Sequence, residues 1–125
     1  MAALAMNGFL IVVCLLLQGG GPIASDVSVG RHLRVIHGSA FTILRQRCGS
    51  CHAGDDAAGD LRLDTPAGVM RGGERGPAVI PGDPRSSLLL RKVLRRDRPA
   101  MPPKRRLPAA EIRILRSWIA AGAPP

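Results

Sequence analysis

The sequence has 125 residues, is 46% hydrophobic but only 2% aromatic, and carries a formal net charge of +9. This length allows one small domain. Phe41 and Trp118 are the aromatic residues after residue 25, too few for stacking against bases, so we expect no nucleic acid among its partners.

The chain opens with an apolar block from Gly8 to Leu17, followed by a glycine-rich stretch and small residues. This pattern is typical of a secretory signal. The block is shorter than the roughly 20 apolar residues that a membrane span needs. We therefore predict a signal peptide over residues 1–25 and an exported, periplasmic protein. An uncleaved anchor is the alternative, because no Lys or Arg precedes Arg31.

Residues 26–35 show no clean hydrophobic period, so we predict an irregular arm there and a folded domain over residues 36–125. From Ser39 the pattern changes. Phe41, Leu44 and Cys48 follow at i, i+3 and i+7, which predicts a short helix that ends at Cys48.

The next residues form a C-x-x-C-H motif, Cys48 to His52. In this spacing two thiols can each form a thioether with a haem vinyl group, and the adjacent imidazole can reach the iron. We interpret Cys48 and Cys51 as covalent haem attachment sites and His52 as the proximal iron ligand.

Two other readings of the motif remain open. Zinc would need a further ligand, for which His32 and His37 are the candidates. A dithiol redox pair would need a βαβ setting, which the surrounding sequence does not indicate. Either histidine could also serve as a sixth iron ligand.

Residues 53–84 are rich in Gly and Pro and predict a long irregular segment. Such a segment is unusual in a compact domain unless it wraps a group that replaces the core, as a haem would. The apolar side chains expected to face the haem or pack beneath it are Leu61, Leu63, Val69, Met70, Val79 and Ile80.

Two further helices are predicted. Asp83-Pro84 would cap and start the first, with a buried stripe of leucines and Val93 and with Arg91, Lys92, Arg95 and Arg96 outside. The second would run from about Pro108 to Ala121. Three short helices joined by long loops predict an all-α fold.

Met101 lies between these two helices and is followed by Pro102 and Pro103. Prolines stiffen the backbone, so the thioether would stand on a rigid loop, and we predict Met101 as the distal iron ligand. His/Met ligation is typical of electron carriers. An iron with all six coordination positions filled leaves none for a small-molecule substrate, so we predict an electron carrier that is not an enzyme. Met70 is the second candidate ligand.

Several motifs in this order resemble the planctomycete-type cytochrome c domain: CGSCH at 48–52, GDLRLD at 59–64, GGERGPA at 72–78, PGDP at 81–84, SLL at 87–89, MPP at 101–103 and WIAAGAP at 118–124. The resemblance implies a small class I cytochrome c fold wrapped around a covalent haem c, with Cys48 and Cys51 as thioethers and His52 and Met101 as axial ligands. A haem peroxidase or ligand sensor with a labile Met101, and a zinc-binding module, are the alternatives.

The net charge is confined to the last third. Residues 85–125 contain nine Arg and two Lys against Asp97 and Glu111, whereas residues 26–84 are balanced. Such a basic region suits an acidic redox partner protein and would also suit a membrane surface. A solvated face with no partner is the alternative.

Overall fold

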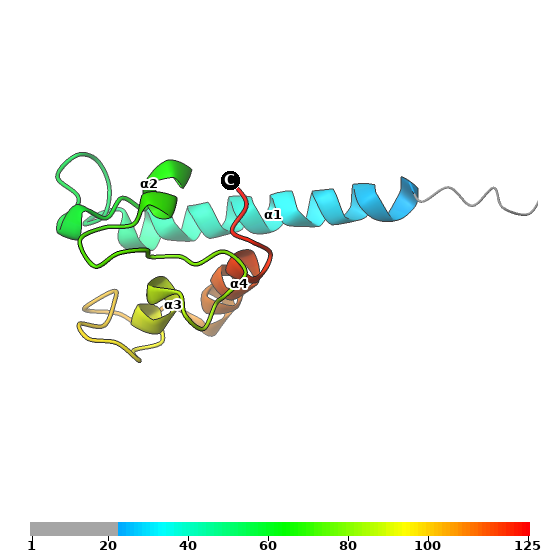
Figure 1. Ribbon diagram of the computed structural model, residues 1–125. Coiled ribbons are helices and arrows are strands. Elements are labelled where there is room, and N and C mark those ends of the chain that lie inside the picture. The colour runs from blue at the N-terminus through cyan, green and yellow to red at the C-terminus, as the bar shows by residue number, and fades with distance from the viewer. Residues whose placement is uncertain (1–22) are drawn as a thin grey trace, which may run out of the picture. The chain divides into compact units, whose positions relative to one another are not determined.

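The computed structural model describes residues 23–125, with side chains from residue 27 onward. Its helices are α1 (Ile23–Cys48), the short 3-10 helix η2 (Ala58–Asp60), α2 (Pro66–Arg71), α3 (Leu88–Val93) and α4 (Ala109–Ala120), shown in Figure 1. Over these residues the fold is helical without strands, and its one β-bridge joins Gly73 to Gly76. The all-α prediction is thereby confirmed, whereas the wrapping of the loops around a haem stays a prediction.

Contacts divide the chain into two compact units, residues 1–30 and 31–125. The described part of the first unit is the beginning of α1. Residues 1–22 of the predicted signal peptide lie outside the described residues, and residues 23–25 belong to α1. None of the described helices combines the length and the apolar character that crossing a membrane requires.

The predicted irregular arm over residues 26–35 is wrong, because α1 runs through it without a break. No proline interrupts this stretch, and Gly30 and Gly38 each cost a helix only about 1 kcal/mol relative to alanine. Val27, Val29 and Val35 are more than half exposed. The arm therefore has no buried stripe that could produce a hydrophobic period, although its backbone is helical.

The Gly- and Pro-rich segment contains more structure than predicted. Thr65 caps α2 by accepting a hydrogen bond from the Gly68 amide at 3.1 Å. Leu63, Val69 and Val79 are buried in the hydrophobic core, as expected of apolar anchors. Met70 and Ile80, by contrast, are 45% and 39% exposed, so they lie outside this core, and their expected packing against a haem stays a prediction.

Helix α3 begins later than predicted. The Asp83 carboxylate accepts the backbone amides of Arg85 and Ser86, at 3.0 and 3.1 Å, and so caps the turn that precedes the helix. The fully buried Ser87 hydroxyl donates to the Asp83 carbonyl at 2.8 Å and accepts the Ile80 amide at 2.9 Å. These bonds fix the chain before α3, which starts at Leu88.

Helix α4 was predicted almost to the residue, and it packs against α3 and α1. Figure 1 shows α3 beside α4, and these two helices make several contacts. The Trp118 ring meets the Phe41 ring of α1 edge-on, with centroids 5.7 Å apart. The Trp118 indole and His37 both bind the Pro124 carbonyl, at 3.1 and 2.8 Å, so the C-terminal segment is tied to both helices.

Candidate functional site

The two cysteines lie on a single turn at the end of α1. The amides of Cys51 and His52 both donate to the Cys48 carbonyl, at 3.1 and 2.9 Å. A Cβ atom on the intervening Gly49 would collide with the Arg45 carbonyl, so the turn needs glycine at this position. Both thiols are free, with Cys48 half-buried and Cys51 exposed.

The surroundings of the Cys48 thiol affect its ionisation. The pKa of Cys48 is raised from 9.0 to about 11, mainly by burial and also by the neighbouring Cys51 and the Glu111 carboxylate. The Cys48 thiol is therefore neutral at physiological pH and packs as a small apolar side chain against the core.

The His52 imidazole is oriented by the loop that follows it. Its Nδ1 lies 3.2 Å from the Leu61 carbonyl oxygen. A carbonyl can only accept, so Nδ1 carries the proton and Nε2 keeps its lone pair for a metal. Metal-binding histidines commonly have their second nitrogen held by a carbonyl in this way.

The loop that supplies this carbonyl is closed by backbone hydrogen bonds on both sides of the site. The Ala58 amide donates to the Cys51 carbonyl, and the Leu63 amide donates to the His52 carbonyl, both at 2.8 Å. Residues 53–62 consequently fold back over the C-x-x-C-H turn. The Leu61 carbonyl is held by this closure.

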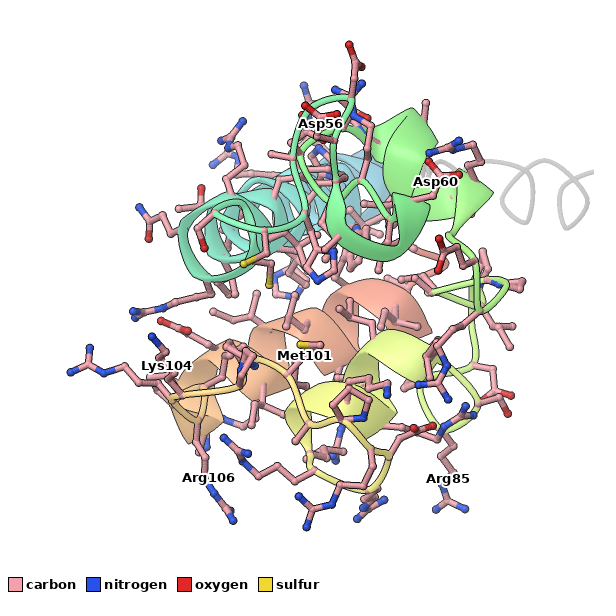
Figure 2. The ribbon with its side chains drawn as sticks, turned by 90° about the vertical axis from the view of Figure 1, so that its left-hand side faces the viewer. Asp56, Asp60, Arg85, Met101, Lys104 and Arg106 are labelled. Atoms are coloured by element: carbon pink, nitrogen blue, oxygen red, sulfur yellow. The ribbon has the colours of Figure 1, made fainter. Side chains whose placement is uncertain are left out.

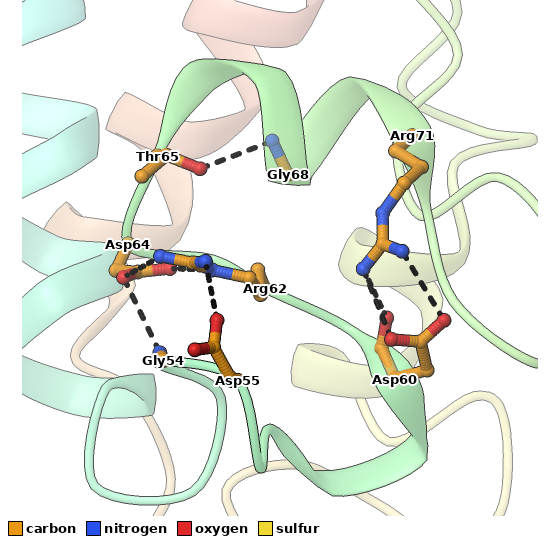
Figure 3. A network of polar contacts seen from close by, with 8 residues as sticks. All are labelled: Gly54, Asp55, Asp60, Arg62, Asp64, Thr65, Gly68 and Arg71. Carbon is orange, nitrogen blue, oxygen red and sulfur yellow. Dashed lines mark hydrogen bonds and ion pairs between the residues drawn. The ribbon is translucent and has the colours of Figure 1, made fainter.

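Ion pairs reinforce the same loop, as Figure 3 shows. The Arg62 guanidinium binds Asp64 through two nitrogens, at 3.1 and 2.9 Å, and Asp64 also accepts the Gly54 amide. The hydrogen bond from Arg62 is the main reason that the pKa of Asp64 falls from 3.8 to about 2. Arg71 of α2 binds both the carboxylate and the carbonyl of Asp60.

Met101 lies on the loop between α3 and α4 and is half-buried. Its amide donates to the Lys92 carbonyl at 3.2 Å. Lys104 and Arg106 of the same loop are exposed and lie near the edge of the view in Figure 2, whereas Met101 lies near its centre. The loop thus separates its thioether from its charged side chains.

Lys92 is buried beneath this loop, although the sequence pattern placed it outside α3. Its Nζ lies 3.0 Å from the Asp97 carboxylate. This hydrogen bond is the main cause of a lowered pKa at Asp97, assisted by Arg75 and Arg91 and opposed by burial. No motif singles out Lys92, because a charged residue beside other charged residues predicts a solvent-facing position.

The predicted site residues therefore occupy two places. Cys48, Cys51 and His52 share one turn, and Met101 stands on a separate loop. His37 is bound to the Pro124 carbonyl and packs against Phe41. Residues 23–125 contain no group of three or more His, Cys, Asp or Glu side chains arranged to hold a metal ion, which gives the zinc reading no support.

An apolar pocket of about 340 Å³ lies elsewhere, between α1, α2 and the C-terminal segment. Phe41, Val69, Met70, Trp118 and Pro124 are among its lining residues. None of the four predicted haem residues lines this pocket, so it is separate from the candidate site.

The comparisons with known proteins agree with the motif. The family model described as planctomycete cytochrome C matches residues 48–105, which include Cys48, Cys51, His52 and Met101. Neither the curated proteins nor the solved structures include a match to the chain. The match supports a planctomycete-type cytochrome c domain over the segment from Cys48 to Arg105.

Proposed function

We propose that the protein is an exported electron carrier that holds haem c covalently through Cys48 and Cys51, with His52 and Met101 as axial ligands. The observation that carries this proposal is the C-x-x-C-H turn, where two free thiols adjoin an imidazole fixed by the Leu61 carbonyl. Cytochrome c domains carry haem and usually transfer electrons, and the family assignment supports that general role.

The chemistry of the residues present fits such a group. Each thiol can form a thioether, and the neutral imidazole offers Nε2 to iron. The buried Nε of Arg95 has no hydrogen-bond partner among the described residues, and a haem carboxylate would provide one. When bound, haem iron supplies reversible one-electron chemistry, which none of the described side chains supplies by itself.

The residues of the C-x-x-C-H turn and its loop would have separate roles in holding the haem. Cys48 and Cys51 would bind the group irreversibly, so that it could not dissociate on contact with a partner. The Leu61 carbonyl keeps the His52 ring in one orientation and one tautomer. Because Cys51 is exposed, a group attached to it reaches the surface, where a partner protein can approach.

Met101 completes the proposed ligand set. A thioether opposite an imidazole raises the haem potential and fills the last coordination position. This arrangement favours electron transfer over catalysis, and we therefore assign the protein no enzymatic activity. A peroxidase or ligand sensor would need Met101 to leave the iron, and no contact of its loop favours that alternative.

The partner that we propose is an acidic redox protein. Lys104, Arg105 and Arg106 are exposed on the Met101 loop and have no acidic residue beside them in the sequence. Their charges would attract an acidic surface to the side of the domain that bears the thioether. Anionic membrane lipid offers the same charge and is the second candidate. Export to the periplasm rests on the apolar block from Gly8 to Leu17.

The test is production of the whole chain in a host that matures exported c-type cytochromes, followed by a pyridine haemochrome assay. We expect one haem per chain that stays attached on a denaturing gel. Cys48→Ser and Cys51→Ser should each lose one thioether and most of the folded protein, because the haem supplies much of the core in so small a domain. Ser50→Ala, on the same turn, is the matched control.

Two results would contradict the proposal. Purified protein that carries zinc and no haem would favour a metal-binding module. A double Cys→Ser variant that folds fully without haem would show that the group is no part of the core.

A further inference from the structure

Lys92 is the one buried charged residue among residues 27–125, with 7% of its surface exposed. Burying an ammonium group is costly unless it is paired and hydrogen-bonded. Its Nζ donates to the Arg98 carbonyl at 2.7 Å and pairs with the Asp97 carboxylate at 3.0 Å. A charge at this position therefore meets two specific partners, both on the segment that leads to Met101.

The same residue also holds Met101 directly. The Lys92 carbonyl accepts the Met101 amide at 3.2 Å. The side chain thus fixes the loop three residues before the proposed ligand, while the main chain fixes the ligand residue itself. Because α3 is a regular helix, both contacts tie the irregular loop to a rigid element.

Neighbouring residues support this attachment. Arg75 donates to the same Arg98 carbonyl at 3.1 Å, and Asp97 also pairs with Arg91 and Arg75, at 3.5 and 3.7 Å. On the other side of Met101, Arg95 donates to the Pro102 carbonyl at 3.4 Å. The carbonyls on both sides of Met101 are thereby bound by cationic side chains.

We propose that Lys92 is a positioning residue that holds the Met101 thioether in place for iron and so excludes external ligands. This inference rests on the proposed His/Met ligation. A loop freed from its anchor gains conformational entropy, so its thioether competes less well with ligands from solution. Residues that support a metal ligand typically change metal affinity or activity by 10- to 100-fold when they are replaced.

The test replaces the buried ammonium and measures competition for the iron. Lys92→Met keeps the apolar stem and the main-chain contact but removes both bonds of Nζ. We expect the oxidised variant to bind added imidazole about tenfold more tightly than the unsubstituted protein, with a weaker sulfur-to-iron absorption band. Arg96→Met, an exposed position on the same loop, is the matched control and should leave both readouts unchanged.

A second variant covers the case in which Lys92→Met does not fold. Asp97→Asn keeps an acceptor oxygen near Lys92 but removes its charge partner, and it should raise imidazole affinity by a smaller factor. Imidazole affinity and band intensity equal to those of the unsubstituted protein in every folded variant would overturn the inference, even if melting temperature falls. Absence of the sulfur band from the unsubstituted protein would instead overturn His/Met ligation itself.

Discussion

At the scale of single residues, Asp64 links loop closure to pH. Its pKa is about 2 in the folded protein, against 3.8 for an unperturbed aspartate, mainly because Arg62 binds the carboxylate. A lowered pKa means that the ionised form favours folding. This contribution is fully present above about pH 4 and is lost as the pH falls toward 2.

We expect Asp64→Asn to be less stable than the unsubstituted protein at neutral pH and to approach its stability near pH 2. Denaturant unfolding of the haem-loaded protein at a series of pH values measures this difference. Asp55→Asn is the control, because Asp55 also contacts Arg62, at 3.3 Å, but its side chain is fully exposed. A difference between Asp64→Asn and the unsubstituted protein that stays constant from pH 7 to 2 would contradict the assignment.

The sequence identified some site residues by chemistry and missed others because their role depends on tertiary contacts. The C-x-x-C-H spacing points to haem regardless of the surrounding fold. The Leu61 carbonyl could not be foreseen, because the loop closure that brings it to His52 is not encoded in a local pattern. Lys92 was missed for a related reason, since its burial results from the loop folding over α3.

At the scale of elements, a helix could be predicted from the sequence where its buried residues recur at a regular spacing. Helix α4 buries Leu115, Trp118 and Ile119 on one side, so its period and its end before Gly122 are evident in the sequence. Helix α2 is one and a half turns long and buries Gly68 and Val69, which is too short for a period to emerge. The first part of α1 has exposed valines and therefore no period at all.

Helix α1 leads to a stability prediction at Gly38. A Cβ atom there would meet no other atom within 4 Å, and the backbone is helical. We expect Gly38→Ala to stabilise the protein by about 0.5–1 kcal/mol, because alanine loses less conformational freedom in a helix than glycine does. Guanidinium unfolding of the haem-loaded protein gives the measurement.

Gly59→Ala provides the contrast for this experiment. Gly59 also has open space around it but a φ of 65°, which costs a side chain about 1–2 kcal/mol. The Gly59→Ala substitution should therefore destabilise the protein. If Gly38→Ala also destabilised the protein, residues near Gly38 would not be helical in solution, and the course of α1 through this position would be wrong.

At the scale of the whole molecule, contacts within residues 31–125 connect the C-x-x-C-H turn to distant parts of the chain. Arg47, one residue before Cys48, binds Glu111 of α4 through two nitrogens, at 3.0 and 2.6 Å. Earlier in α1, the Phe41 ring contacts the Trp118 ring, and His37 is hydrogen-bonded to the Pro124 carbonyl of the C-terminal segment. The turn is thus supported by the last helix, which lies beyond the segment that the family model matches.

The basic last third should influence electron transfer through its position as well as its total charge. Charges separated by more than about 10 Å are largely screened at 0.1 M salt, so an anionic reagent is attracted mainly by the cations nearest its approach. We expect oxidation of the reduced protein by hexacyanoferrate(III) to slow as ionic strength rises, and oxidation by a cationic cobalt(III) complex to accelerate. Stopped-flow absorbance at several salt concentrations measures both slopes.

Two double variants separate local charge from net charge. Lys104→Glu with Arg106→Glu reverses two charges on the Met101 loop, whereas Arg113→Glu with Arg116→Glu reverses two exposed charges on α4. The total charge changes equally in both. If anionic reagents approach along the Met101 loop, the first pair of substitutions should slow oxidation by hexacyanoferrate(III) far more than the second pair. Equal slowing would mean that net charge alone steers the reagent, and the proposed docking surface on the loop would have to be abandoned.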